Sequence, residues 1–175
     1  MTPVRNSLRT LAAVVVILIV VFSASFIVAQ SDAHKSFDLL KGLEGNWAGK
    51  NSQGQTIQVT FRLTAGGSAL MSEILEPASE KRGAEDMISM FHMDGERLLM
   101  THYCAAGNQP RLKLVAAYGK SVSFEFMDGT NIGPGDGHMQ HVTITVPDAD
   151  HHVEEWTFLD HGKEMKEVFT LERAK

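Results

Sequence analysis

The stretch EDMISMFHMDGERLLMTHYC, residues 85–104, carries two short apolar runs on either side of an Asp94-Gly95 pair. Short runs rich in apolar, β-branched and aromatic residues, bounded by turn residues, are typical of β-strands. An Asp-Gly pair between two such runs is a strong signal for a two-residue hairpin turn. The stretch therefore predicts a pair of antiparallel strands.

The turn also predicts the register of this hairpin. A two-residue Asp94-Gly95 turn places His102 across from Met87 and Cys104 across from Glu85. Successive side chains of a strand point to opposite faces, and we assign to the interior the face that is less charged at its turn end. Its members are Glu85, Met87, Ser89, Phe91, Leu98, Met100, His102 and Cys104.

The same kind of pattern continues along most of the chain, with turn signals such as Gly66-Gly67 and His161-Gly162 between the apolar runs. It predicts ten strands, at 46–51, 55–63, 68–76, 85–93, 96–104, 111–117, 121–127, 138–146, 151–159 and 164–172. A short helical turn precedes them in FDLLKGLEG, residues 37–45. Closure removes the edges of a long antiparallel sheet. We therefore expect an all-β fold, a closed or nearly closed up-and-down β-barrel with a short N-terminal helical turn.

Residues 1–33 differ from the rest of the chain in composition. Arg5 and Arg9 precede Leu11–Ala29, a run of nineteen residues that is almost wholly apolar, and small residues follow it. This order is typical of a signal peptide, although the run also approaches the roughly 20 residues that span a bilayer. We predict a signal peptide, with an N-terminal membrane anchor as the alternative. Both place the barrel domain, 34–175, outside the cytoplasm, in the periplasm or secreted.

The charge of the folded part excludes two classes of partner. All 21 acidic residues but only 14 of the 16 basic residues lie after residue 30, which gives 14 − 21 = −7 with neutral histidines. Without a basic patch, neither a nucleic acid nor an anionic membrane surface is expected to bind. The single cysteine cannot form an intramolecular disulfide, so the core must stabilise the fold.

The motif Gly45-Asn46-Trp47, after the helical turn and at the start of the first strand, gives the chain a family resemblance. Together with the β-meander over residues 37–173, it resembles the calycin superfamily, which includes lipocalins, fatty-acid-binding proteins and nitrobindin-like haem barrels, in a bacterial secreted branch. In lipocalins this tryptophan packs at the base of the barrel under a basic residue from near the end of the barrel. The resemblance implies that Trp47 and Arg173 make this pair, and ten strands suit the fatty-acid-binding and nitrobindin-like barrels better than lipocalins.

Candidate chemistry gathers at His102 and Cys104, which lie two apart on one strand and so share a face. With Glu85 they provide at most three of the four ligands of a structural zinc site, so no metal site is predicted, although His102 is a weak candidate for a metal or haem iron. A thiol nucleophile needs a base within hydrogen-bond reach. The simpler interpretation is that Cys104 acts as a small core hydrophobe and His102 as a hydrogen-bonded polar residue.

The residues after Cys104 predict a tight connection. Gly107-Asn108 suits a two-residue turn, which would place Arg111 on the same face as Cys104, whereas a three-residue loop would place it on the opposite face. The alternation Leu112-Lys113-Leu114 favours the second register, with Arg111 at the mouth of the barrel or outside it.

Our hypothesis is an exported, lipocalin-like protein that binds a small, largely apolar molecule inside the barrel and is not an enzyme. The expected ligand contacts are Glu85, Met87, Met100, His102 and Cys104 in the cavity, and Asn108, Gln109, Arg111 and Asn131 at its rim. Three alternatives stay open. They are haem or metal binding through His102, a small-molecule enzyme that uses Glu85, His102 and Cys104 as catalytic groups, and a structural envelope protein whose barrel is filled by side chains.

Overall fold

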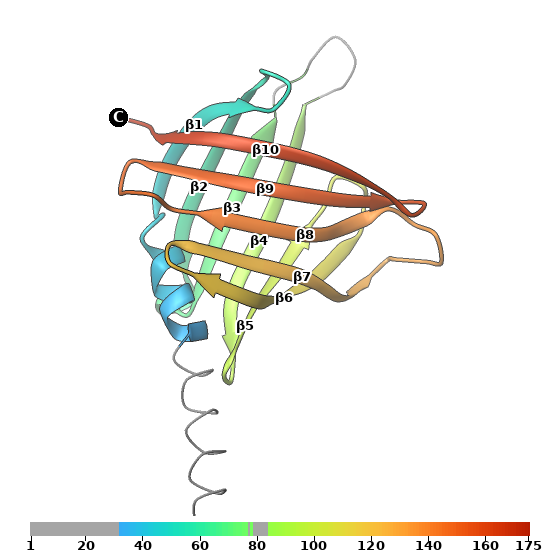
Figure 1. Ribbon diagram of the computed structural model, residues 1–175, viewed down its shortest axis with the longest axis horizontal. Coiled ribbons are helices and arrows are strands. Elements are labelled where there is room, and N and C mark those ends of the chain that lie inside the picture. Colours follow the sequence, from blue (N-terminus) through green and yellow to red (C-terminus); the bar gives the residue numbers. More distant parts are fainter. Residues whose placement is uncertain (1–31, 77, 79–83) are drawn as a thin grey trace, which may run out of the picture. The chain divides into compact units, whose positions relative to one another are not determined.

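All ten predicted strands are present in the computed structural model, which describes residues 32–76, 78 and 84–175. They close into one antiparallel barrel in the order β1-β10-β9-β8-β7-β6-β5-β4-β3-β2 (Figure 1). Their bounds are β1 Gly45–Asn51, β2 Thr56–Thr64, β3 Ala69–Glu76, β4 Glu85–Asp94, β5 Arg97–Tyr103, β6 Gln109–Tyr118, β7 Ser121–Thr130, β8 His138–Thr145, β9 His151–Asp160 and β10 Lys163–Arg173. The prediction of an all-β, up-and-down barrel is confirmed. The predicted signal peptide or membrane anchor falls mainly on residues 1–31, outside the described residues.

The barrel closes between its first and last strands. Trp47 of β1 pairs with Arg173 of β10, and the ladder continues to the pair formed by Asn51 and Phe169. The guanidinium carbon of Arg173 lies 4.2 Å from the centre of the Trp47 ring, a distance at which a cation is attracted by the ring face. The pair implied by the family resemblance is therefore present.

A helix over residues 32–41 covers one end of the barrel. Three of its apolar residues, Ala33, Phe37 and Leu40, are at most 5% exposed and belong to the core of the barrel. Leu43 follows in the turn after the helix, and its carbonyl accepts a 2.7 Å hydrogen bond from the Trp47 indole N–H. Within the described part of the chain, this and the other helical segments lack the length and apolarity that crossing a bilayer requires.

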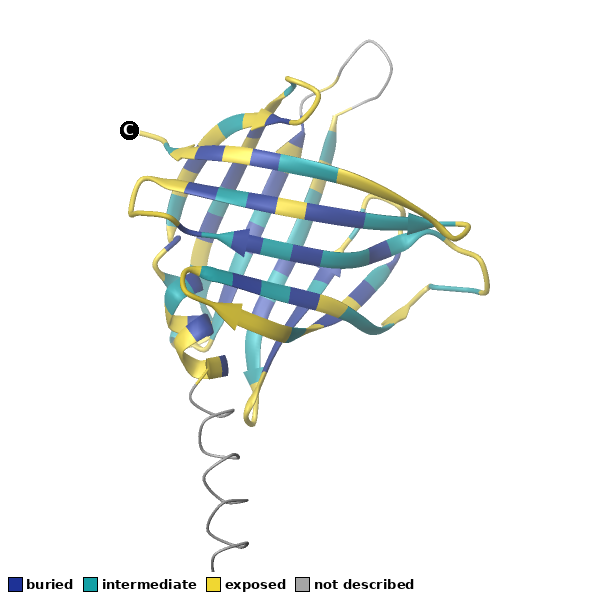
Figure 2. Cartoon of the chain, in the orientation of Figure 1, coloured by how far each residue is buried: buried dark blue, intermediate teal, exposed yellow. Residues whose placement is uncertain are grey.

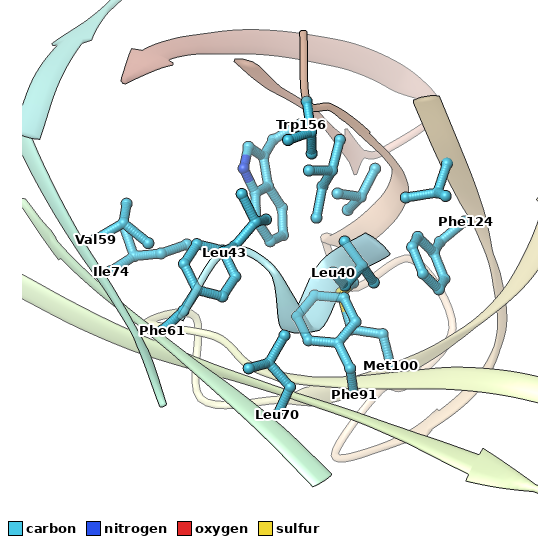
Figure 3. Packing of buried hydrophobic residues seen from close by; sticks show 14 of the residues in the cluster. Leu40, Leu43, Val59, Phe61, Leu70, Ile74, Phe91, Met100, Phe124 and Trp156 are labelled. Carbon is cyan, nitrogen blue, oxygen red and sulfur yellow. The ribbon is translucent and has the colours of Figure 1, made fainter. Parts of the chain in front are cut away.

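The core lies in the half of the barrel next to this helix. Most strands alternate buried residues with more exposed ones over part of their length (Figure 2), as a sheet with one solvated face does. Figure 3 shows Leu40 and Leu43 among inward-pointing side chains of the strands, including Phe61, Phe91 and Phe124. These aromatic rings fill the helix end of the barrel, so a ligand can enter only elsewhere.

The hairpin between β4 and β5 has the predicted inward face but a different register. Asp94 pairs with Arg97, so that the turn is Gly95-Glu96 and His102 lies across from Ser89, not Met87. Gly95 has a φ of +59°, and a glycine at the first central position is characteristic of a type II′ hairpin turn. The Asp94 carboxylate also forms an ion pair with Arg97.

Candidate functional site

A cavity of about 470 Å³ opens at the end of the barrel opposite the N-terminal helix. It lies where β3, β5 and β9 end and where β4, β8 and β10 begin, beside the connections from β1 to β2 and from β5 to β6. Its lining consists of Gln53, Ile74, Glu76, Glu85, Met87, His102, Cys104, Ala105, Ala106, Met139, Trp156, Phe158, Met165, Lys166, Glu167 and Phe169. Ligand pockets of proteins span about 300–1,000 Å³, so the cavity has room for one small molecule.

His102 on β5 is the deepest polar residue of the lining, with 1% of its surface exposed. Its Nδ1 lies 2.9 Å from the hydroxyl of Ser89 on the neighbouring strand. Its Nε2 has no hydrogen-bond partner among the described residues. Burial lowers the pKa of His102 to about 4, because a charged imidazolium is poorly solvated inside the barrel. At neutral pH the cavity therefore meets a neutral imidazole with one nitrogen atom available to a ligand.

Trp156 forms part of the wall next to His102, with 5.1 Å between the ring centres. A buried hydrogen-bond chain on β9 holds its indole in place. The Trp156 indole N–H donates to Glu154 at 2.9 Å, and the other carboxylate oxygen of Glu154 lies 3.0 Å from His152 Nε2. His152 in turn packs edge-on against Trp47, with ring centres 4.3 Å apart. The chain thus connects the cavity wall to the packed end of the barrel.

Cys104 also lines the cavity, but it is poorly suited to nucleophilic chemistry. Burial raises the pKa of its thiol, and the negative charge of Glu85 acts in the same direction. The thiolate is the nucleophilic form of cysteine, so little of it is present at neutral pH. His102, with its lowered pKa, is a weak base for proton transfer at that pH. This pair therefore favours binding over thiol catalysis.

The structure brings four of the predicted ligand contacts together at the cavity: Glu85, Met87, His102 and Cys104. Met100 lies deeper on the same face of β5, where it is fully buried in the core. It supports the floor of the barrel and does not line the cavity.

Two of the predicted rim residues make structural contacts elsewhere. Asn108 is 3% exposed, and its side-chain amide donates to the Gly137 carbonyl at 2.8 Å, which joins two loops at the open end. Arg111 lies on the outer face of β6, where its guanidinium forms a bidentate ion pair with Asp128. The connection before them is Ala105–Gly107, closed by a 2.9 Å hydrogen bond between backbone atoms of Gly107 and Cys104. The connection is thus a three-residue loop and not a Gly107-Asn108 turn, and Arg111 lies on the outer face, as the favoured alternative predicts.

The other two predicted rim residues bind each other. The side-chain oxygen of Gln109 accepts hydrogen bonds from Asn131 at 3.1 Å and from the Thr130 hydroxyl at 2.7 Å. Neither Gln109 nor Asn131 lines the cavity.

Most of the cavity wall comes from residues that the sequence analysis did not single out. Trp156 and Phe158 lie two apart on β9, and Met165 and Phe169 lie on β10, its partner in the barrel. The two-residue spacing on β9 was the available signal, because it places both aromatic rings on one face. Glu76 was missed although it pairs directly with Glu85 across the ladder from β3 to β4.

No set of three or more His, Cys, Asp or Glu side chains in the described part of the chain is arranged to hold a metal ion. Among the described lining residues, His102 Nε2 is the nitrogen atom that would hold a haem iron, since the imidazole is neutral and this nitrogen has no described partner.

Comparison with known proteins gives no family. No model of a known protein family matches the chain, and no curated protein matches it. Among solved structures, two similar ones are as follows. A redesigned β-barrel is similar over 77% of this chain and 94% of its own, with 16% identity and a TM-score of 0.40. The protein EF1p2_mFAP2b bound to DFHBI is similar over 83% of this chain and 99% of its own, with 11% identity and a TM-score of 0.39. Both TM-scores are below 0.5, so neither similarity supports an inference about function.

Proposed function

We propose that this protein is a calycin-like binding protein that holds one small, largely apolar molecule in the open half of its barrel. The observation that carries the proposal is the cavity of about 470 Å³, which has a mostly apolar wall and a buried imidazole nitrogen without a described partner. An apolar pocket with a few polar groups that orient the ligand is the usual form of a small-molecule site. A barrel filled by side chains throughout, as in a purely structural protein, would leave no such space.

Native mass spectrometry tests this proposal directly. The full chain is produced in an exporting host, purified without detergent and measured before and after denaturation. We expect a mass above that of the chain, which is lost on denaturation. A bare mass, repeated after incubation with a lipid extract of the host and with haem, would contradict the proposal.

A pair of matched variants locates the site. Met87 lines the cavity on β4, whereas Met90 lies on the outer face of the same strand. Met87→Trp adds volume inside the cavity, so we expect it to abolish the bound mass. Met90→Trp makes the same change outside and should retain the ligand. Loss of ligand in both variants, or in neither, would place the molecule elsewhere.

Haem is the second candidate ligand, because His102 Nε2 can serve as an axial ligand. When bound, haem would supply redox or gas-binding chemistry. A Soret band after addition of haem, lost in His102→Gln, would identify this ligand, and the mass of the bound molecule would distinguish it from a lipid-like one.

Export is part of the same proposal. It is supported by the order of Arg5, Arg9, the apolar run Leu11–Ala29 and the small residues after it. N-terminal sequencing of protein recovered from the periplasm or medium tests it. A start near residues 30–34 indicates cleavage, whereas an intact N-terminus in the membrane fraction indicates the anchor.

A further inference from the structure

The hydrogen bond between Ser89 and His102 determines which ring nitrogen of the imidazole carries the proton. Ser89 is fully buried, and its hydroxyl oxygen lies 2.9 Å from His102 Nδ1. Ser72 is the direct partner of Ser89 across the ladder from β3 to β4, but the Ser72 hydroxyl makes no hydrogen bond within the described chain. Among the residues that the structure describes, Nδ1 is therefore the acceptor available to the Ser89 hydroxyl proton.

The two tautomers of His102 differ in the number of buried polar groups that they leave unpaired. A neutral imidazole has one N–H donor and one acceptor nitrogen. With the proton on Nε2, Nδ1 accepts the hydrogen bond from Ser89, and the Nε2–H alone remains without a described partner. With the proton on Nδ1, both the Ser89 hydroxyl proton and the Nε2 lone pair would lack one. Buried polar groups without partners are costly, so the first tautomer is favoured and Nε2 presents a donor to the cavity that His102 lines.

The environment of this donor favours a neutral acceptor over a charged one. Burial lowers the pKa of His102 to about 4, so the imidazole is neutral at pH 7. An ionised carboxylate beside it would lose hydration without gaining a positive charge on the imidazole in return, which is unfavourable. A carbonyl oxygen accepts the same hydrogen bond without carrying a full charge.

The wall next to His102 is suited to the apolar body of a ligand. The rings of Trp156 and His102 lie 5.1 Å apart between their centres. The indole N–H of Trp156 already donates to Glu154 at 2.9 Å, so this side chain offers the cavity its ring surface and no second donor. Phe158 follows two residues nearer the open end of β9 and also lines the cavity. A ligand can thus meet the His102 donor at its inner end and aromatic surface along its length.

From this combination we infer that the ligand is an apolar carbonyl compound, a ketone, aldehyde or ester, whose oxygen accepts a hydrogen bond from His102 Nε2–H and whose body packs against Trp156. The inference rests on the proposed binding function and names the chemical class of the ligand. It separates this barrel from carriers of fatty acids, whose carboxylate is charged. It also ranks haem lower, because an iron ligand needs the lone pair of Nε2, and the proton would then move to Nδ1 and deprive the Ser89 hydroxyl of its described acceptor.

Nitrogen-15 NMR of the histidine rings tests the tautomer. The full chain is produced in an exporting host with labelled histidine, and correlations between ring protons and ring nitrogens show which nitrogen is protonated. The signals of His102 are those missing from the spectra of His102→Gln and His102→Phe. We expect the proton on Nε2 at pH 7. A proton on Nδ1 would overturn the inference.

Three probes of the same shape test the carbonyl group. 2-Acetonaphthone, 2-isopropylnaphthalene and 2-naphthoate carry a ketone, a hydrocarbon group and a carboxylate on one naphthyl body. Equilibrium dialysis against the protein from the full chain gives the affinity for each. A hydrocarbon leaves water more readily than a ketone whatever its partner, so the informative quantity is how the ratio of the two affinities changes with the protein variant.

Two matched variants supply this comparison. His102→Phe removes the donor and keeps a ring, so the affinity for the ketone should fall about fivefold relative to that for the hydrocarbon, as the loss of one hydrogen bond predicts. His92→Phe makes the same change on the outer face of β4 and should leave the ratio unchanged. Thermal melts confirm that both variants fold. Should His102→Phe fail to fold, the ring NMR of the wild type decides the inference.

The outcomes separate this inference from the proposed function. If the probes bind but His102→Phe leaves the ratio unchanged, the carbonyl inference is wrong while the binding function stands. If 2-naphthoate binds the wild type more tightly than the ketone does, the ligand is a carboxylate and the inference is likewise wrong. If no probe binds, the carbonyl inference is wrong, and a bare mass in native mass spectrometry then removes the binding function as well.

Discussion

Replacement of His102 by glutamine should remove much of the acid sensitivity of this fold. The imidazole is 1% exposed, and burial lowers its pKa from the ordinary 6.5 to about 4. The unfolded chain therefore binds a proton at this residue before the folded chain does. As the pH falls from 6.5 toward 4, the free energy of unfolding decreases, and above pH 6.5 this group has no effect.

The size of the effect follows from the two pKa values. A difference of about 2.5 units, at about 1.4 kcal/mol per unit, corresponds to about 3 kcal/mol. This is a large share of the roughly 5–15 kcal/mol that stabilises a typical domain. Glutamine can still form a hydrogen bond with Ser89 but does not titrate, so His102→Gln should follow a shallower stability profile in acid than the wild type.

The assay is urea unfolding followed by tryptophan fluorescence, at intervals from pH 7.5 to 4.5. Between the neutral and the acid end of this range, the free energy of unfolding of the wild type should fall by about 3 kcal/mol more than that of His102→Gln. His151→Gln is the control, because the hydrogen bond with Asp148 raises the pKa of this exposed histidine. Removal of His151 should therefore change the pH dependence of the free energy of unfolding in the opposite direction. Parallel profiles for the wild type and His102→Gln would refute the reasoning.

Three further predictions concern the frame of the barrel and its thiol. Arg173→Met should lower the free energy of unfolding by about 1–3 kcal/mol, measured in urea, because it removes the guanidinium from the Trp47 ring and its hydrogen bonds to backbone carbonyls. Gly49→Ala should lower the melting temperature by several degrees or prevent folding, since its Cβ would overlap the Thr170 carbonyl; an unchanged melt would contradict this. Cys104 should react with iodoacetamide at pH 7.5 more slowly than in urea, because burial raises its pKa; equal rates by mass spectrometry would contradict this.

The strands and their faces were predictable because a strand is a local pattern. Each apolar run between turn residues became a strand with bounds within a few residues of those expected. The hairpin of β4 and β5 shows how robust the faces are. Its turn lies at Gly95-Glu96, one residue later than expected, which shifts the pairing by two residues. A shift by two keeps every side chain on its face, so His102 still points inward although its partner is Ser89.

The cavity was only partly predictable, because its two walls are far apart in the sequence. Glu85 and His102 belong to neighbouring strands and could be placed from one hairpin. Trp156 and Phe169 belong to β9 and β10, which reach the same space only when β10 closes the barrel against β1. The hydrogen bond of Asn108 was not predictable for a related reason, since its partner Gly137 lies in a loop whose position no local pattern reveals.

The distribution of polar groups inside the barrel connects its stability with its function. The helix end is filled by leucine and aromatic side chains. Three polar residues are also buried, with at most 1% exposure: His102 lines the cavity, whereas Glu154 and His152 connect the cavity wall to the packed end. Apolar residues of similar volume at such positions are often neutral or stabilising, so stability alone does not explain these three. Glu154 accepts a hydrogen bond from the Trp156 indole and is itself hydrogen-bonded to His152, and His102 offers Nε2 to the cavity. These polar groups thus form the cavity wall or hold it in place, and this links their energetic cost to binding.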